Sequence, residues 1–262
     1  MDWNELSNLE INTFFGTRNL QVLSMVNNRL EKIMDGTFRW TQSLEYLNVA
    51  RNALTHIDIS MIPSLKHANV SFNQLRKLTI PSEIEILDAS HNHILTVPNG
   101  TNTYLTKLNL SFNGITGTAW LHQFPLLKEL DLSYNELEAI TFRDLRTIHN
   151  IEKLLLSNNR LMVLNLREPI QSLRVLDVSH NGLVHVENNQ KQFETLKQLY
   201  LNHNSLVTLR IGRNNTLEKL MLSNNDWDCN NIRSVILRRR AARGCCNVPM
   251  IAAALLVHLQ TL

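Results

Sequence analysis

The chain has 262 residues, 44% of them hydrophobic, with only 8 Gly and 6 Pro, so it can form one large or two small domains and is not low-complexity. Its formal net charge of +3 depends on five arginines near the C-terminus, without which the balance turns slightly negative. The remainder therefore lacks the overall positive field of a nucleic-acid-binding protein. The longest apolar run, residues 250–259, is about half of the roughly 18 residues that span a bilayer.

Along the chain, one short pattern recurs: L-x-x-L-x-L-x-x-N-x-L, with aliphatic substitutions at the leucine positions. The copies cover residues 20–30, 44–54, 65–75, 84–94, 105–115, 127–137, 151–161, 173–183, 196–206 and 217–227. Their asparagines are Asn28, Asn52, Asn73, Asn92, Asn113, Asn135, Asn159, Asn181, Asn204 and Asn225, spaced by 19 to 24 residues. Asn4 stands 24 residues before Asn28, so the chain is expected to begin inside a further repeat.

Each copy predicts a short strand, because alternation sends its two leucines inward and the residues between them outward. So short a strand cannot bury its own face, and copies are expected to stack as a parallel sheet about 4.8 Å apart. The asparagine amide both donates and accepts, which suits the buried backbone groups of the turn that follows. We therefore predict a leucine-rich repeat solenoid over residues 1–228: an α/β, horseshoe-like fold of short parallel strands with irregular or short helical returns.

The return half of each repeat carries a second signal. An aliphatic residue stands five positions after the asparagine in eight copies, and the short intervals leave room for turns or single helical turns. These aliphatic residues are Ile33, Ile57, Leu78, Val97, Ile140, Leu164, Val186 and Leu209. They are expected to complete the core from the side opposite the strands.

The outward residues of the strands are expected to form an extended concave face. Its central column is Ser24, Asn48, Asn69, Asp88, Asn109, Asp131, Leu155, Asp177, Tyr200 and Met221. A second outward column is predicted for Ser71, Ser90, Ser111, Ser133, Ser157, Ser179 and Ser223, beside a ring-rich edge of Phe72, His91, Phe112, Tyr134, His180 and His203.

Two interpretations of this face remain open. The small polar residues fit a repeat consensus that solvates the sheet. The apolar and aromatic departures late in the chain fit a protein contact patch instead, since interfaces use such side chains as anchors. The predicted partner-binding residues are Leu155, Tyr200, Met221, Tyr134, His180 and His203.

Catalysis is not expected. Asp88, Asp131 and Asp177 lie in alternate repeats, about 10 Å apart, whereas a shared-proton dyad needs about 3 Å. His180 and His203 have no nearby Cys or Asp with ligand spacing, so no metal site is predicted. No phosphate loop, dinucleotide fingerprint or nucleophile elbow occurs, so no cofactor is expected.

Four glycosylation sequons begin at Asn69, Asn99, Asn109 and Asn214. A glycan on Asn69 or Asn109 would obstruct the outward sheet face. The candidate acceptors are therefore Asn99 and Asn214.

The three cysteines, Cys229, Cys245 and Cys246, cluster after the last repeat, and their odd number leaves one thiol over. Trp227 replaces the final leucine and Cys229 follows closely, which resembles the cysteine-bearing C-terminal cap of extracellular leucine-rich repeat proteins. That resemblance implies a bond from Cys229 to Cys245 or Cys246 and an extracellular setting, since such bonds do not persist in cytosol.

At finer grain, residues 44–231 resemble the Plasmodium-responsive leucine-rich repeat immune proteins of mosquitoes. The resemblance rests on stretches such as residues 62–71, 87–92, 131–138 and 225–230. It implies secretion into haemolymph and pairing with a second leucine-rich repeat protein through an interchain disulfide and a coiled coil. It further implies that the pair holds a complement-like thioester protein, with one of the adjacent Cys245 and Cys246 reaching the partner chain.

The chain departs from that family at both ends. Residues 1–5 do not show the pattern of a signal peptide, and the first repeats of the family are not found. Residues 229–246 match a shortened remnant of the family's cap. Residues 247–262 are an atypical tail without heptads. We therefore expect a chain truncated at both ends. Two other functions fit the repeats: an ectodomain fragment of a receptor or adhesion protein, and a cytosolic scaffold, which requires reduced thiols.

Overall fold

The computed structural model describes residues 1–98, 100, 102–166, 168–188, 190–211 and 214–228. Cys229, Cys245, Cys246 and Asn99 lie outside the described residues, as do the predicted cap (229–246) and tail (247–262).

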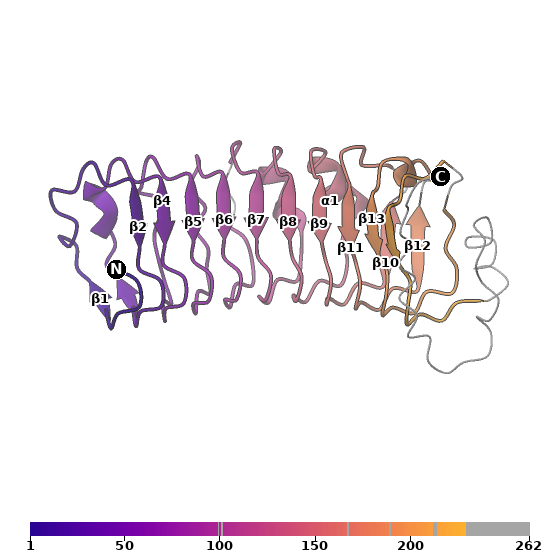
Figure 1. The fold of residues 1–262 in the computed structure, drawn as a ribbon, viewed down its shortest axis with the longest axis horizontal. Coiled ribbons are helices and arrows are strands. Elements are labelled where there is room, and N and C mark those ends of the chain that lie inside the picture. Colours follow the sequence, from indigo (N-terminus) through magenta and orange to yellow (C-terminus); the bar gives the residue numbers. More distant parts are fainter. Residues whose placement is uncertain (99, 101, 167, 189, 212–213, 229–262) are drawn as a thin grey trace.

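The described chain winds into a solenoid in which each turn contributes one short strand to a ten-stranded parallel sheet (Figure 1). The strands stack in chain order, and every pairing joins the same position of successive repeats, as in Leu108 with Leu130. The strands are β2 (Val22–Ser24), β4 (Tyr46–Asn48), β5 (His67–Asn69), β6 (Ile86–Asp88), β7 (Lys107–Asn109), β8 (Glu129–Asp131), β9 (Lys153–Leu155), β11 (Val175–Asp177), β13 (Gln198–Tyr200) and β14 (Lys219–Met221). The predicted fold class is thereby confirmed.

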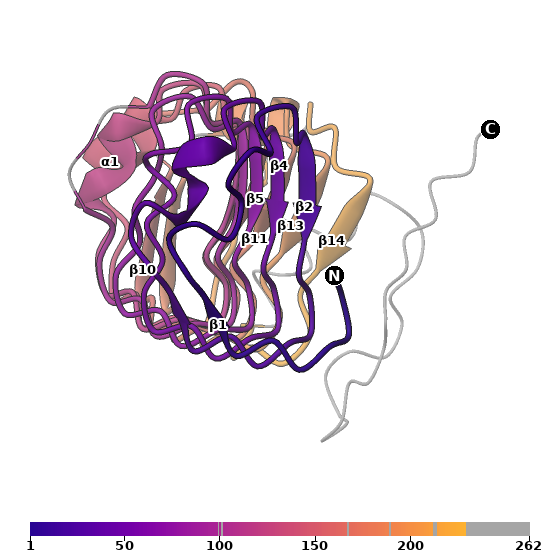
Figure 2. The ribbon, with the colours of Figure 1, turned by 90° about the vertical axis from the view of Figure 1, so that its left-hand side faces the viewer.

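The returns carry little regular structure, as their lengths predict. Two small parallel sheets pair β1 (Asn8–Leu9) with β3 (Lys32–Ile33) and β10 (Val163–Leu166) with β12 (His185–Asn188). Short helices are η1 (Thr37–Trp40), η2 (Ala119–Gln123), α1 (Phe142–Thr147) and η3 (Gln190–Glu194). Figure 2 shows α1 and β10 on the side of the solenoid away from the main sheet.

Helix α1 begins at a capping box, which explains why this return is helical. The Thr141 hydroxyl accepts a hydrogen bond from the Asp144 backbone N–H, and the Asp144 carboxylate accepts one from the Thr141 N–H. Two of the helix's unpaired N–H groups are thereby satisfied.

The core lies between the main sheet and the returns. In the main sheet, the central residue of each strand from β2 to β13 is buried and its neighbours in the strand are exposed or half-buried. All eight aliphatic residues five positions after a repeat asparagine are buried opposite them. Because each turn packs only against the turns next to it, its aliphatic side chains are buried by those of the adjacent repeats.

The ten repeat asparagines form a continuous ladder of hydrogen bonds along the core. Asn135 is typical: its Oδ1 accepts from the Ile115 N–H of the preceding repeat at 2.9 Å. Its Nδ2 donates to carbonyl oxygens of Leu110, Leu132 and Ser133 at 2.9, 3.1 and 3.3 Å. Each amide therefore connects two repeats and satisfies backbone groups that the turn removes from water.

The ladder generates the first prediction. Asn135→Asp keeps the acceptor but loses the donated bonds and buries a charge, so we expect a loss of about 3 kcal/mol in the free energy of unfolding, measured by urea denaturation. The matched control is Asn109→Asp, since Asp88 and Asp131 occupy that column in the neighbouring repeats. It should change stability by less than about 0.5 kcal/mol. Equal losses in the two variants would contradict a structural role specific to the ladder.

Candidate functional site

The outward residues of the main sheet form what we call the strand face. Of the predicted contact residues, Tyr200 and Met221 are directly paired on β13 and β14, whereas Leu155 on β9 is separated from Tyr200 by Asp177. All three apolar side chains are half-buried. The structure therefore brings Tyr200 and Met221 together at the C-terminal end and places Leu155 two strands away.

The Tyr200 ring is held in place by its neighbours. Its hydroxyl donates to Gln198 Oε1 at 3.0 Å, and the Lys219 ammonium lies 4.8 Å from the ring centroid. A fixed aromatic ring with a cation above it loses little side-chain entropy on binding, which suits a contact residue.

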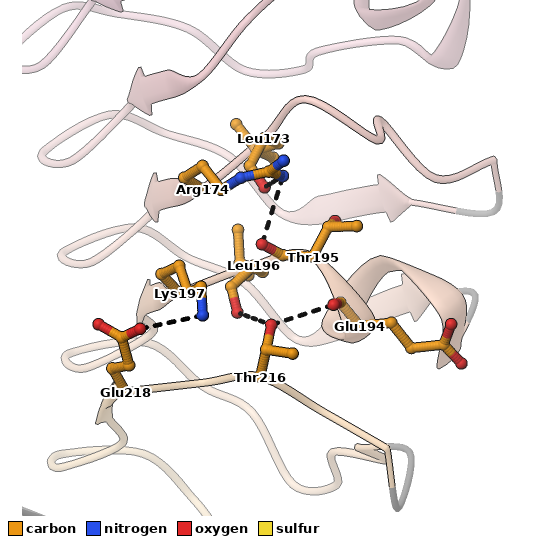
Figure 3. A network of polar contacts seen from close by, with 8 residues as sticks. All are labelled: Leu173, Arg174, Glu194, Thr195, Leu196, Lys197, Thr216 and Glu218. Atoms are coloured by element: carbon orange, nitrogen blue, oxygen red, sulfur yellow. Dashed lines mark hydrogen bonds and ion pairs between the residues drawn. The ribbon is translucent and has the colours of Figure 1, made fainter. Parts of the chain in front are cut away.

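Polar cross-links join the repeats that carry Tyr200 and Met221 (Figure 3). Lys197 and Glu218 pair at 3.0 Å, and the Thr216 hydroxyl donates to the carbonyl oxygens of Glu194 and Leu196 at 3.1 and 3.2 Å. Arg174 Nη1 reaches the Thr195 carbonyl oxygen of the next repeat at 3.4 Å. These contacts hold the repeats that carry Tyr200 and Met221 in a fixed position relative to each other.

The serine column does not point outward, which corrects the sequence-based prediction. Ser71, Ser90, Ser111, Ser133, Ser157 and Ser179 are buried, and most bond to the residue two positions earlier. Ser90 is typical, with its N–H and hydroxyl donating to Asp88 Oδ1 at 3.0 and 2.7 Å. The chain turns inward immediately after the strand, so alternation fails there.

The same bonds define what the carboxylates of the central column do. Asp88, Asp131 and Asp177 each accept from the backbone N–H of the serine that follows. Asn69 and Asn109, the sequon residues on this column, do the same. These side chains hold the turn, while Asn214, a predicted glycan acceptor, is exposed in a turn between repeats.

The residue before each repeat asparagine adopts a left-handed backbone conformation, with φ between 52° and 57°. This repeated turn aligns the ring-rich edge into two stacks. Phe72, His91, Phe112 and Tyr134 stack with centroid separations of 3.9, 4.0 and 4.0 Å. His180 and His203 form a second stack at 4.0 Å, and Asn158 stands between the two.

Tyr134 therefore does not join His180 and His203, although the sequence grouped all three as contact residues. Arg51, which was not among the predicted contact residues, extends the first stack, with its guanidinium carbon 4.2 Å from the Phe72 ring centroid. The available signal was its position directly before Asn52, where the other repeats carry rings or asparagine. Tyr134 is 47% exposed, so the stack presents ring edges to solvent.

In the second stack, His180 has a pKa below its ordinary value. Burial lowers its pKa, the charge of His203 lowers it further, and Asp177 partly opposes both. Among the described residues, no group of three or more His, Cys, Asp or Glu is placed to hold a metal ion, and no described helix is long and apolar enough to cross a membrane.

Known proteins share this architecture. The family described as Leucine rich repeat matches residues 18–75 and 103–161. The crystal structure of the leucine-rich repeat domain of APL1B is 46% identical, with a TM-score of 0.88, over 94% of this chain and 74% of that one. The chain belongs to the mosquito leucine-rich repeat immune protein family. It is thus a leucine-rich repeat protein-binding module.

A second structure from this family is a complex. The LRIM1/APL1C complex contains a chain 49% identical to this one, with a TM-score of 0.88, over 95% of this chain and 48% of that chain. Human Toll-like receptor 3 is 31% identical over 221 residues, which are 72% of this chain but 24% of the receptor. The chain thus spans about a quarter of that curated relative.

The His180 environment generates a pH prediction. Because the folded pKa lies below the ordinary 6.5, the unfolded chain binds the proton more readily, and stability is lost as the pH falls below 6.5. We expect the melting temperature to drop between about pH 7.5 and about pH 5.5, and the drop to be smaller in His180→Asn. Asparagine is compatible with the left-handed turn, as Asn158 shows. An identical drop in both proteins would contradict the role of His180.

Proposed function

We propose that this protein acts in insect innate immunity by pairing, outside the cell, with a second leucine-rich repeat protein. The observation that carries the proposal is the LRIM1/APL1C complex, whose similar chain is 49% identical over 95% of this one. The finer steps follow from the resemblance read in the sequence: secretion into haemolymph, and retention of a complement-like thioester protein by the pair.

We place the pairing surface at the C-terminal end of the strand face, around Tyr200 and Met221. Three features support this: the two side chains are adjacent, the Tyr200 ring is held by Lys219 and Gln198, and the repeats beneath are cross-linked. In the sequence, Cys229 comes eight positions after Met221, and Cys245 and Cys246 come later. The resemblance implies one intrachain disulfide among these cysteines and one interchain disulfide to the partner.

A second candidate is the ectodomain of a receptor, which the match to human Toll-like receptor 3 favours. In that function the strand face or ring stacks would bind a ligand without a disulfide-linked partner chain. Sequencing the full transcript discriminates the two, because a receptor requires a transmembrane helix downstream.

The first test is the covalent state of the native protein. Non-reducing electrophoresis of material secreted by insect cells co-expressing a second leucine-rich repeat protein of the family should give a heterodimer band that dithiothreitol removes. Cys245→Ser combined with Cys246→Ser should abolish it. A monomer with three free thiols would contradict the proposal and favour a cytosolic scaffold.

The second test measures the surface. Tyr200→Ala combined with Met221→Ala should weaken binding of the second leucine-rich repeat protein by about tenfold or more, measured by biolayer interferometry under reducing conditions. Tyr46→Ala is the matched control, since Tyr46 is a half-buried tyrosine at the opposite end of the strand face. Unchanged affinity in the double variant would place the pairing surface elsewhere.

A further inference from the structure

A hollow of about 480 Å³ opens among the return segments of three successive repeats. Residues 77–80 form one wall, residues 96, 98, 100 and 102 the next, and Gln123 and Phe124 the third. The first of these segments belongs to the shortest repeat, in which Asn73 and Asn92 are 19 positions apart. The third carries η2 and belongs to a longer repeat, in which Asn113 and Asn135 are 22 positions apart, so the short return leaves space beside it unfilled. The volume is within the usual range of small-molecule pockets.

The wall of the hollow is largely apolar. Its accessible apolar surface belongs mainly to Ile80, which is half-buried, and to Pro98, which is exposed, because Leu78 and Phe124 are only 3% and 2% exposed. An apolar body that entered would remove this surface from water, which is the main source of affinity in such sites.

Gln123 supplies a polar feature at this wall. The side chain is only 5% exposed, and its Oε1 accepts from the Gly100 N–H at 2.7 Å. That bond fixes the amide orientation, and the Nε2 atom is then fully buried with no hydrogen-bond acceptor among the described residues. A buried donor without an acceptor costs on the order of 1–3 kcal/mol. Because Gln123 lines the hollow, a ligand oxygen placed at its amide would supply the missing acceptor.

The charge at the opening is positive. Lys77 is exposed and is the one ionisable side chain among the described residues that line the hollow. The amide of Asn102, by contrast, is saturated by bonds to Pro81, Ile84, Tyr104 and Leu105. The hollow thus offers unused donors and a positive charge around an apolar wall.

We propose that this hollow binds a small apolar carboxylate, of the class of a medium-chain fatty acid anion. The hydrocarbon body contacts chiefly Ile80 and Pro98, and the carboxylate oxygens accept from Lys77 and from the Gln123 amide. The site lies on the returns, so it is independent of the pairing surface proposed on the strand face.

The test is a nuclear magnetic resonance titration of the full chain with octanoate, octanol and octylammonium, each below its critical micelle concentration. Octanoate should shift the Gly100 backbone amide and the Gln123 side-chain amide saturably and should bind more tightly than octylammonium. Lys77→Ala should weaken octanoate binding by about threefold or more and leave octanol binding unchanged. Lys128→Ala, an exposed lysine outside the hollow, should change neither.

Ile80→Trp fills the hollow without removing a polar group and should abolish binding of both octanoate and octanol. Three outcomes would overturn the proposal: no saturable shift at Gly100 with millimolar octanoate, equal binding of octanoate and octylammonium, or equal octanoate affinity in Lys77→Ala and the unmodified chain. Because Lys77 is exposed, its variant keeps the test valid even if Ile80→Trp does not fold.

Discussion

Each repeat asparagine bonds to two repeats at once, accepting a backbone N–H from the preceding turn and donating to carbonyl oxygens of both turns. A three-residue strand followed by a sharp inward turn leaves these groups buried, and water cannot reach them. Their hydrogen bonds must come from a side chain that both donates and accepts. That requirement explains why asparagine occupies this position in every repeat. The bonds of its amide then set how each turn stacks on the preceding one. The remaining features of the molecule are built on this spacing.

The turn imposes consequences on its neighbours. The residue before the asparagine takes a left-handed conformation, which aligns successive rings such as His91 and Phe112 into stacks. The Asp or Asn of the central column accepts from the buried serine that follows. Much of the polarity of the strand face is therefore committed to holding the turn. The proposed pairing surface therefore consists of side chains that depart from the repeat, Tyr200 and Met221.

The two proposed binding surfaces, the hollow among the returns and the strand face, lie on different parts of the repeat. Repeat proteins are stabilised by contacts between neighbours, so a local change in one return disturbs little else. The shortened return that carries Lys77 and Leu78 could therefore leave a hollow without disrupting the ladder above it. The strand face, by contrast, is continuous, and its C-terminal end leads directly into the cysteine-bearing segment. We propose a small molecule as the ligand of the hollow and a second protein chain of the same family as the partner of the strand face.

The sequence by itself determined the repeat, the ladder positions and the inward aliphatic residues, because a strand has a period of two and the solenoid repeats at 19 to 24 residues. It placed Asp88 correctly in the central column but not Ser90, because the direction of a side chain after the strand depends on a backbone turn that alternation does not encode. It also grouped Tyr134 with His180, whereas the stacking depends on which residue each turn brings alongside. The hollow beside Gln123 required the tertiary structure, since its space arises from the difference in length between returns that meet only when the repeats are stacked.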